Sequence, residues 1–103
     1  MPHDLEDRFH VAMLKIYDNA SAACSGYRPT RFRQLVVEIG GLATAKQLLR
    51  GKTPASGFTE LFICGRLDLS MEALVLTEPW NQLFSSAELA ESKRRLLEVG
   101  FSN

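Results

Sequence analysis

Few side chains in this sequence are of a kind that performs chemistry. His3 and His10 stand seven residues apart and could share one face of a helix that begins early. Cys64 could act as a nucleophile only beside a general base, and no base is indicated near it. A zinc site needs about four ligands in a fixed geometry, and no cysteine near the histidines completes one. We therefore expect a protein that is not an enzyme and that has no metal site and no cofactor.

Length and composition favour one globular domain. The chain has 103 residues, of which 46% are hydrophobic and 23% charged, so a single domain over residues 1–103 with its own core is expected. Its two cysteines, Cys24 and Cys64, predict packing residues in a reducing compartment rather than a disulfide framework. The amino terminus lacks an apolar secretion core, and no run approaches about 18 apolar residues. These features predict a cytoplasmic protein without membrane contact.

The elements that must position these side chains are helical. Apolar residues recur at three- and four-residue steps, and no segment alternates with period two. The sequence therefore predicts an all-α, single-domain bundle of five to seven short helices. The first helix is expected to end at Ser25-Gly26, and the second to be capped by Thr30 and ended by Gly40-Gly41. The third should run from Leu42 to Gly51, and the fourth should restart at Thr53-Pro54 and end at Gly65. Ser70 should cap the fifth, and the last should run from a Ser85–Glu88 capping box to Gly100.

The same periodicity predicts which apolar side chains face the core. In the later helices the expected inward residues are Phe32, Leu35, Val36, Ile39, Phe58, Leu61, Phe62, Leu89, Leu96 and Leu97. Glu91 and Arg95 are one turn apart and are expected to form a supporting pair on the last helix.

Charge is balanced over the whole chain but not along it. Lysine plus arginine and aspartate plus glutamate each number 12, whereas residues 28–52 hold six basic residues against Glu38 and carry a net charge of +5. The basic residues are Arg28, Arg31, Arg33, Lys46, Arg50 and Lys52. Such a stretch can attract phosphate or an acidic protein surface, or it can be a solvated helix face.

The basic stretch also has the lengths of a helix-turn-helix, with Gly40-Gly41 as the turn. In that interpretation Thr44, Lys46, Gln47 and Arg50 would face the major groove. A plain helical hairpin gives the same pattern, and both alternatives stay open.

Residues 63–66 are not fully explained as fold signals. Arg66 and Asp68 flank one residue of a turn, and an ion pair between them would pin that turn. Ile63 and Cys64 project away from the stripe of the fourth helix. They either contact another helix or form an exposed apolar spot for a partner.

Parts of the sequence resemble a group of small, functionally uncharacterised bacterial proteins. The resemblance covers roughly residues 5–100 and rests on Tyr27, Pro29-Thr30-Arg31-Phe32, Gly40-Gly41, Thr44-Ala45-Lys46, Leu48-Leu49, Ser56, Gly57-Phe58-Thr59, Leu61, Gly65-Arg66-Leu67-Asp68-Leu69 and Glu72-Ala73-Leu74-Val75-Leu76. It implies a bacterial or phage source and a helical fold, but no activity. The chain departs from the pattern at Ile63-Cys64, where a more polar pair is expected.

Small helical proteins without catalytic groups are typical of phage and mobile-element cargo. We therefore expect a non-catalytic protein-binding module, an anti-CRISPR-like inhibitor that sterically blocks a bacterial defence effector, acting as a monomer or homodimer. The alternative is a helix-turn-helix-like nucleic-acid-binding regulator. The residues expected to bind the partner are Arg28, Arg31, Arg33, Lys46, Arg50, Ile63, Cys64 and Arg66.

Overall fold

Residues 4–24, 28–51 and 56–100 are described by a computed structural model of the chain. Within these ranges every regular element is helical, which confirms the predicted all-α bundle of five to seven short helices. The α-helices are α1 (Asp4–Ala23), α2 (Thr30–Ile39), α3 (Gly41–Arg50), α4 (Ser56–Ile63), α5 (Met71–Leu76) and α6 (Ser86–Glu98), and the 3-10 helices η1 (Leu67–Leu69) and η2 (Trp80–Leu83) flank α5.

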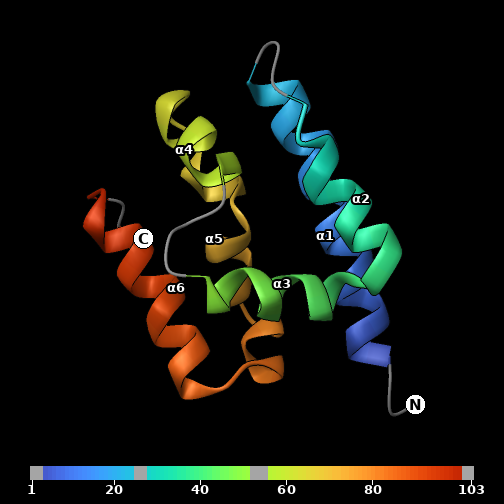
Figure 1. Ribbon diagram of the computed structural model, residues 1–103. Coiled ribbons are helices and arrows are strands. Elements are labelled where there is room, and N and C mark those ends of the chain that lie inside the picture. The colour runs from blue at the N-terminus through green and yellow to red at the C-terminus, as the bar shows by residue number, and fades with distance from the viewer. Residues whose placement is uncertain (1–3, 25–27, 52–55, 101–103) are drawn as a thin grey trace.

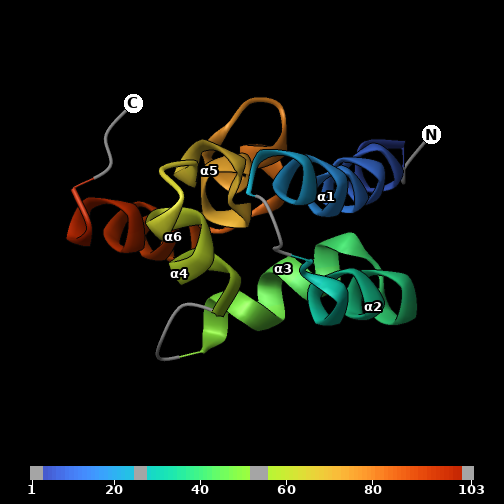
Figure 2. The same cartoon turned by 90° about the horizontal axis from the view of Figure 1, so that it is seen from above.

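The helices form two groups that α3 connects. α1 and α2 lie side by side at one edge of the molecule and α6 lies at the opposite edge, with α3 crossing between them (Figure 1). α5 is central and packs mainly against α6, while α4 packs mainly against η1. Viewed from above, α4 and α2 lie on the same side of α5 and α1 (Figure 2). This arrangement leaves α4 facing the α1–α2 pair.

Two clusters of buried apolar side chains hold the helices together. The larger cluster joins α1, α2, α3 and α5, and its ring of Phe9 lies 5.5 Å from that of Phe84 and 5.7 Å from that of Trp80. The smaller cluster joins the end of α1 to α4, η1 and α6 through residues that include Ala20, Phe58 and Leu96. Burying one large apolar side chain is worth about 1.5–3 kcal/mol, so the smaller cluster contributes to holding α4 and α6 in place.

The starts of α5 and α6 are those predicted from the sequence. The Ser70 hydroxyl accepts a hydrogen bond from the Ala73 N–H at 3.2 Å. The Glu88 N–H donates to the Ser85 hydroxyl at 3.2 Å, and the Ser85 N–H donates to the Glu88 carboxylate at 2.8 Å. The reciprocal pair confirms the predicted capping box.

Other predicted boundaries are wrong or untested. Thr30 does not cap α2, since the helix begins at Thr30 and Pro29 occupies the cap position without a side-chain hydrogen bond. The Pro29 carbonyl instead accepts the N–H of Arg33 at 3.1 Å. The expected restart at Thr53-Pro54 lies outside the described residues.

Three apolar residues expected in the core are exposed. Ile39, Phe62 and Leu97 have exposed fractions of 43%, 48% and 53%. They lie on α2, α4 and α6, which are peripheral helices with neighbours on only part of their circumference. Periodicity predicts the centre of an apolar stripe, but the neighbouring helices decide how much of its width is covered.

Gly41 allows α3 to touch α1 at backbone distance. Its N–H donates to the Nδ1 atom of His10 at 3.0 Å, and a Cβ atom placed on Gly41 would lie 2.7 Å from the Cα atom of His10. Only a residue without a side chain fits this crossing, because the atom opposed to it belongs to the backbone of α1.

We expect Gly41→Ala to destabilise the protein by about 1–3 kcal/mol, because α1 and α3 must move apart to admit the methyl group. Urea unfolding followed by circular dichroism measures the effect. Ala43→Ser, an exposed change on the same helix, is the control and should stay within about 0.5 kcal/mol of the parent. Equal stability of Gly41→Ala and parent would contradict the close crossing.

Candidate binding site

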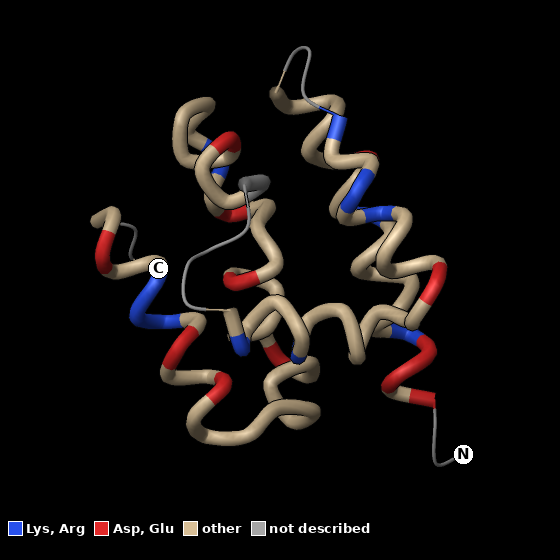
Figure 3. The backbone as a smooth tube through the Cα atoms, viewed as in Figure 1, with Lys and Arg blue, Asp and Glu red and all other residues tan. Residues whose placement is uncertain are grey.

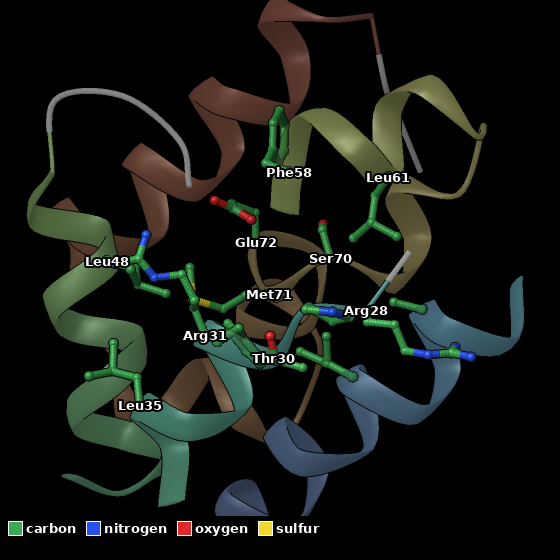
Figure 4. Close-up of a pocket in the computed structure, with 14 residues that line it drawn as sticks. Arg28, Thr30, Arg31, Leu35, Leu48, Phe58, Leu61, Ser70, Met71 and Glu72 are labelled. Carbon is green, nitrogen blue, oxygen red and sulfur yellow. The ribbon is translucent and has the colours of Figure 1, made fainter. Parts of the chain in front are cut away.

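A cavity of about 430 Å³ lies between α1, α2, α4 and α5. Figure 4 shows that its lining side chains come from helices that are distant in the sequence. The lining consists of Ile16, Ala20, Arg28, Pro29, Thr30, Arg31, Phe32, Leu35, Leu48, Phe58, Leu61, Ser70, Met71 and Glu72. Most of these side chains are apolar, and the volume is in the range of ligand sites in proteins.

Helical spacing explains how each wall is made. Ile16 and Ala20 are four residues apart on α1, and Phe58 and Leu61 are three apart on α4, so each pair presents one face to the cavity. All four side chains are buried. Leu48 of α3 also lines the cavity and is only half-buried.

Two buried polar groups of the cavity wall, Ser70 and Glu72, are bonded within the protein. The Ser70 hydroxyl donates to the Leu67 carbonyl at 2.7 Å and also caps α5. The Glu72 carboxylate accepts a hydrogen bond from Arg95 at 3.1 Å. The Ser70 hydroxyl proton is therefore used within the protein, and Glu72 is held by Arg95.

Three arginines lie in the segment that leads into α2 and in its first turns, and we call Arg28, Arg31 and Arg33 the arginine row. Arg28 and Arg31 line the cavity and extend to opposite sides of it (Figure 4). All three side chains are exposed. Among the residues that the structure describes, the side chains of Arg28 and Arg31 make no ion pair or hydrogen bond, and the Arg33 guanidinium lies 5.7 Å from the centre of the Tyr17 ring. Figure 3 shows these cations as a run along α2 with one acidic residue near its end. That residue is Glu38, which accepts a hydrogen bond from Gln34 at 3.2 Å.

The two basic residues of the predicted site that lie on α3, Lys46 and Arg50, do not join the row. The Lys46 ammonium donates to Glu88 at 2.7 Å and lies 5.1 Å from the centre of the Phe84 ring. Arg50 is exposed at the α6 end of α3, on the other side of the bundle from α2. The basic stretch of the sequence is therefore divided in space between the arginine row at α2 and two residues of α3, of which Lys46 is paired with α6.

The helix-turn-helix interpretation loses two of its four groove residues. α2 and α3 are joined by Gly40 alone, whose φ of 94° turns the chain sharply. Thr44 is fully buried and cannot face a groove in this fold, and the partly exposed Lys46 is engaged with Glu88. Gln47 and Arg50 are exposed.

The cysteines are bonded to each other, which corrects the prediction of two separate packing residues. Cys24 follows α1 and Cys64 follows α4, and their Cα atoms lie 5.9 Å apart in a disulfide. The two cysteines meet because α1 and α4 both pack against η1. They are 40 residues apart in the sequence, and that separation alone does not indicate that they are neighbours in the fold. In this form Cys64 has no thiol to act as a nucleophile.

The disulfide also argues against the predicted cytoplasmic location, because structural disulfides are typical of oxidising compartments. None of the helices in the described ranges is both long enough and apolar enough to cross a membrane. Over the same ranges, no three histidine, cysteine, aspartate or glutamate residues are grouped so that they could hold a metal ion.

In residues 63–66, Ile63 is exposed, whereas Arg66 is paired within the turn. Ile63 is 71% exposed, so the alternative that it packs into the core is wrong, and it lies with Phe62 on the outer side of α4. Arg66 forms two hydrogen bonds with Asp68, at 3.0 and 3.2 Å, as predicted for a pinned turn. The hydrogen bond from Arg66 holds the pKa of Asp68 below its usual range.

A buried arginine centre is the largest feature that the sequence did not reveal. Arg95 is 1% exposed and donates to Glu91 at 2.7 Å and to Glu72 at 3.1 Å. It also donates to the carbonyls of Leu48, Leu49 and Gly51, at 3.1, 3.4 and 2.9 Å. One side chain of α6 thus satisfies the carboxyl end of α3 and neutralises Glu72 of α5. The predicted Glu91–Arg95 pair is confirmed, but as part of this centre.

The two carboxylates of the centre have pKa values shifted in opposite directions. Hydrogen bonds from Arg94 and Arg95 lower the pKa of Glu91 to about 2. Burial raises the pKa of Glu72 above its usual range despite the bond from Arg95. Ionised Glu91 therefore stabilises the fold, whereas ionised Glu72 is tolerated only because Arg95 is beside it.

We expect Glu91→Gln to lower stability by about 1 kcal/mol at pH 7, because the pair is partly solvated. A depressed carboxyl pKa stabilises the fold above the ordinary value and loses its effect as pH falls through the folded-state value. The difference between parent and variant should therefore shrink between about pH 4.5 and pH 2. Urea midpoints over that range measure it, with Glu60→Gln, an exposed carboxylate on α4, as the control. A difference that does not change with pH would contradict this role of Glu91.

Comparisons of the chain with family models, curated protein sequences and solved structures find no match in any of the three. The resemblance to small bacterial proteins therefore stays an expectation, and any function must be inferred from the cavity and the arginine row.

Proposed function

We propose that this protein is a non-catalytic protein-binding module that uses the arginine row to bind an acidic surface of a partner protein. The observation that carries the proposal is the exposed, unpaired state of Arg28 and Arg31 beside an apolar cavity, among the residues described. Arginine is enriched in the centres of protein interfaces.

The charge pattern favours a local acidic partner surface. The chain has a formal net charge of zero, so the row is a local field and not part of a generally basic molecule. Each guanidinium offers five donors in a planar fork that fits a carboxylate with two hydrogen bonds. Such a row steers encounter and sets orientation, whereas adjacent apolar area supplies most of the affinity.

The inhibitor role expected from the sequence is compatible with this mode of binding. Covering a partner's surface needs no catalytic group, so an anti-CRISPR-like blocker of a defence effector would use the row directly. The Cys24–Cys64 disulfide weighs against a partner that is restricted to the cytoplasm. The general proposal is therefore binding to an acidic protein surface. Inhibition of a defence effector is a more specific version of it.

Capture with matched variants tests the proposal. Immobilised parent protein and an Arg28→Glu/Arg31→Glu variant are exposed to extract of the source cell, and proteins retained only by the parent are purified and titrated directly. Lys15→Glu/Lys93→Glu, exposed lysines on α1 and α6, is a control with the same change in net charge. We expect about tenfold or greater loss of affinity in the arginine variant, none in the control, and weakening by salt.

Two results would contradict the proposal. One is that no protein distinguishes the parent from the arginine variant. The other is salt-dependent binding to duplex DNA that is lost when Lys46 and Arg50 are replaced, which would favour the nucleic-acid-binding alternative.

A further inference from the structure

The Cys24–Cys64 disulfide joins the two helices that form the apolar walls of the cavity. The Cys24 N–H donates to the Ala20 carbonyl at 2.9 Å, so Cys24 continues the hydrogen-bond ladder of α1 one turn beyond Ala20. The Cys64 N–H donates to the Glu60 carbonyl at 3.1 Å and continues the ladder of α4 in the same way, one turn beyond Leu61. Ala20 and Leu61 both line the cavity. The bond therefore ties one end of the α1 wall to one end of the α4 wall.

Few other contacts hold α4 in place. The helix has eight residues and packs mainly against η1, and a helix this short is not stable on its own. Among its described side chains Phe58 and Leu61 are buried, whereas Phe62 and Ile63 are exposed. The other α-helices pack on one another. α4 is therefore the helix that should open first when the bond is broken.

The two cysteines are not equally accessible. Cys24 is 5% exposed, whereas Cys64 is an exposed residue of the turn that follows α4. A thiolate must reach the sulfur atom that it attacks, and exposed disulfides are typically the labile and regulatory ones. A reductant should therefore attack Cys64 and displace Cys24 as the leaving thiolate.

We infer that this disulfide is a redox clamp, which holds the α4 wall of the cavity in place when oxidised and releases it when a dithiol reduces the bond. One thiolate of the dithiol forms a bond to the Cys64 sulfur as the bond to Cys24 breaks, and the Cys24 thiolate takes up a proton. The second thiolate attacks the mixed disulfide and releases Cys64, which is protonated in turn. The protein gains two electrons and two protons, and the dithiol is oxidised to a disulfide. The clamp acts on the wall itself, whichever partner the protein binds.

Hydrogen–deuterium exchange of the folded protein, before and after treatment with a dithiol, tests the clamp. Protection of the α4 amides should fall by about tenfold or more on reduction, while α5 and α6 stay protected by about a hundredfold or more. Re-oxidation should restore the protection of α4. The Cys24→Ala/Cys64→Ala variant is the control, and its exchange should match that of the reduced parent with and without the dithiol.

Reduced glutathione identifies the sulfur atom that is attacked, because a monothiol can stop at the mixed disulfide. The reaction is quenched with acid, and the protein is digested for mass spectrometry. We expect glutathione on Cys64 in about tenfold excess over Cys24.

Three results would overturn the inference. Equal protection of α4 in the oxidised and the reduced protein would show that other contacts hold the wall. Loss of protection in all helices to the same low level would show that the bond stabilises the whole fold and not one wall. Glutathione found mainly on Cys24 would contradict the direction of attack.

Discussion

Arg95→Ala is expected to destabilise the protein by about 3–5 kcal/mol, since it breaks a buried ion pair on one side only. Glu72 would remain buried with no cation beside it, and the carbonyls of Leu48, Leu49 and Gly51 would lose their shared donor. A domain of this size has about 5–15 kcal/mol of total stability. The change should therefore remove a large part of the free energy of unfolding. A much lower urea midpoint in a urea titration measures this loss.

The pH dependence of this loss identifies its cause. Burial already raises the pKa of Glu72, and losing Arg95 would raise it further. A carboxyl with a raised folded-state pKa contributes stability that is complete below the ordinary value and is lost as pH rises through the raised one. The cost of Arg95→Ala should therefore be larger at pH 7 than at pH 4, and Arg95→Ala/Glu72→Gln should recover part of it.

Arg94→Ala is the matched control for this prediction. Arg94 is the adjacent arginine and binds Glu91 and Glu98, but its side chain is 49% exposed. Its loss should cost less than about 1 kcal/mol. If the two arginine variants were equally stable, Arg95 could not be the buried centre that joins α3, α5 and α6.

Reduction of the Cys24–Cys64 disulfide is expected to cost about 4 kcal/mol. The bond closes a loop with a sequence separation of 40 residues, and the chain-entropy model gives about this value for such a loop. α4 has few other neighbours besides η1. Loss of the bond should therefore release the cavity wall that contains Phe58 and Leu61.

Thermal unfolding with and without a dithiol reductant measures this effect. The Cys24→Ala/Cys64→Ala variant should match the reduced parent in stability and should not respond to the reductant. A thiol titration of the unfolded parent, purified without reductant, should find no free thiol. Two titratable thiols in that sample would contradict the disulfide.

Local sequence signals predicted the helices well, because they depend on residues that are close together in the chain. The apolar repeat of α1 and the capping residues Ser70, Ser85 and Glu88 act within one or two turns. Their interactions are nearly the same in an isolated helix and in the fold. The number of helices and most of their limits follow from such signals.

The site could not be predicted in the same way, because its parts meet only after the chain folds. The cavity uses side chains from α1 to α5, and the disulfide joins residues that lie 40 apart. Arg95 looked like one half of a surface pair, since charged residues are rarely buried. Thr44 and Lys46 looked like groove residues, since the burial of Thr44 and the pairing of Lys46 with Glu88 depend on how the helices pack.

The disulfide also makes part of the polypeptide a covalent ring. α2, α3 and α4 all lie between Cys24 and Cys64 in the sequence. Cleavage of any one peptide bond within that ring leaves a single covalent molecule, with the arginine row still attached to α1 and α6. Such a nicked protein would run at its full mass under non-reducing conditions and separate into two pieces only after reduction.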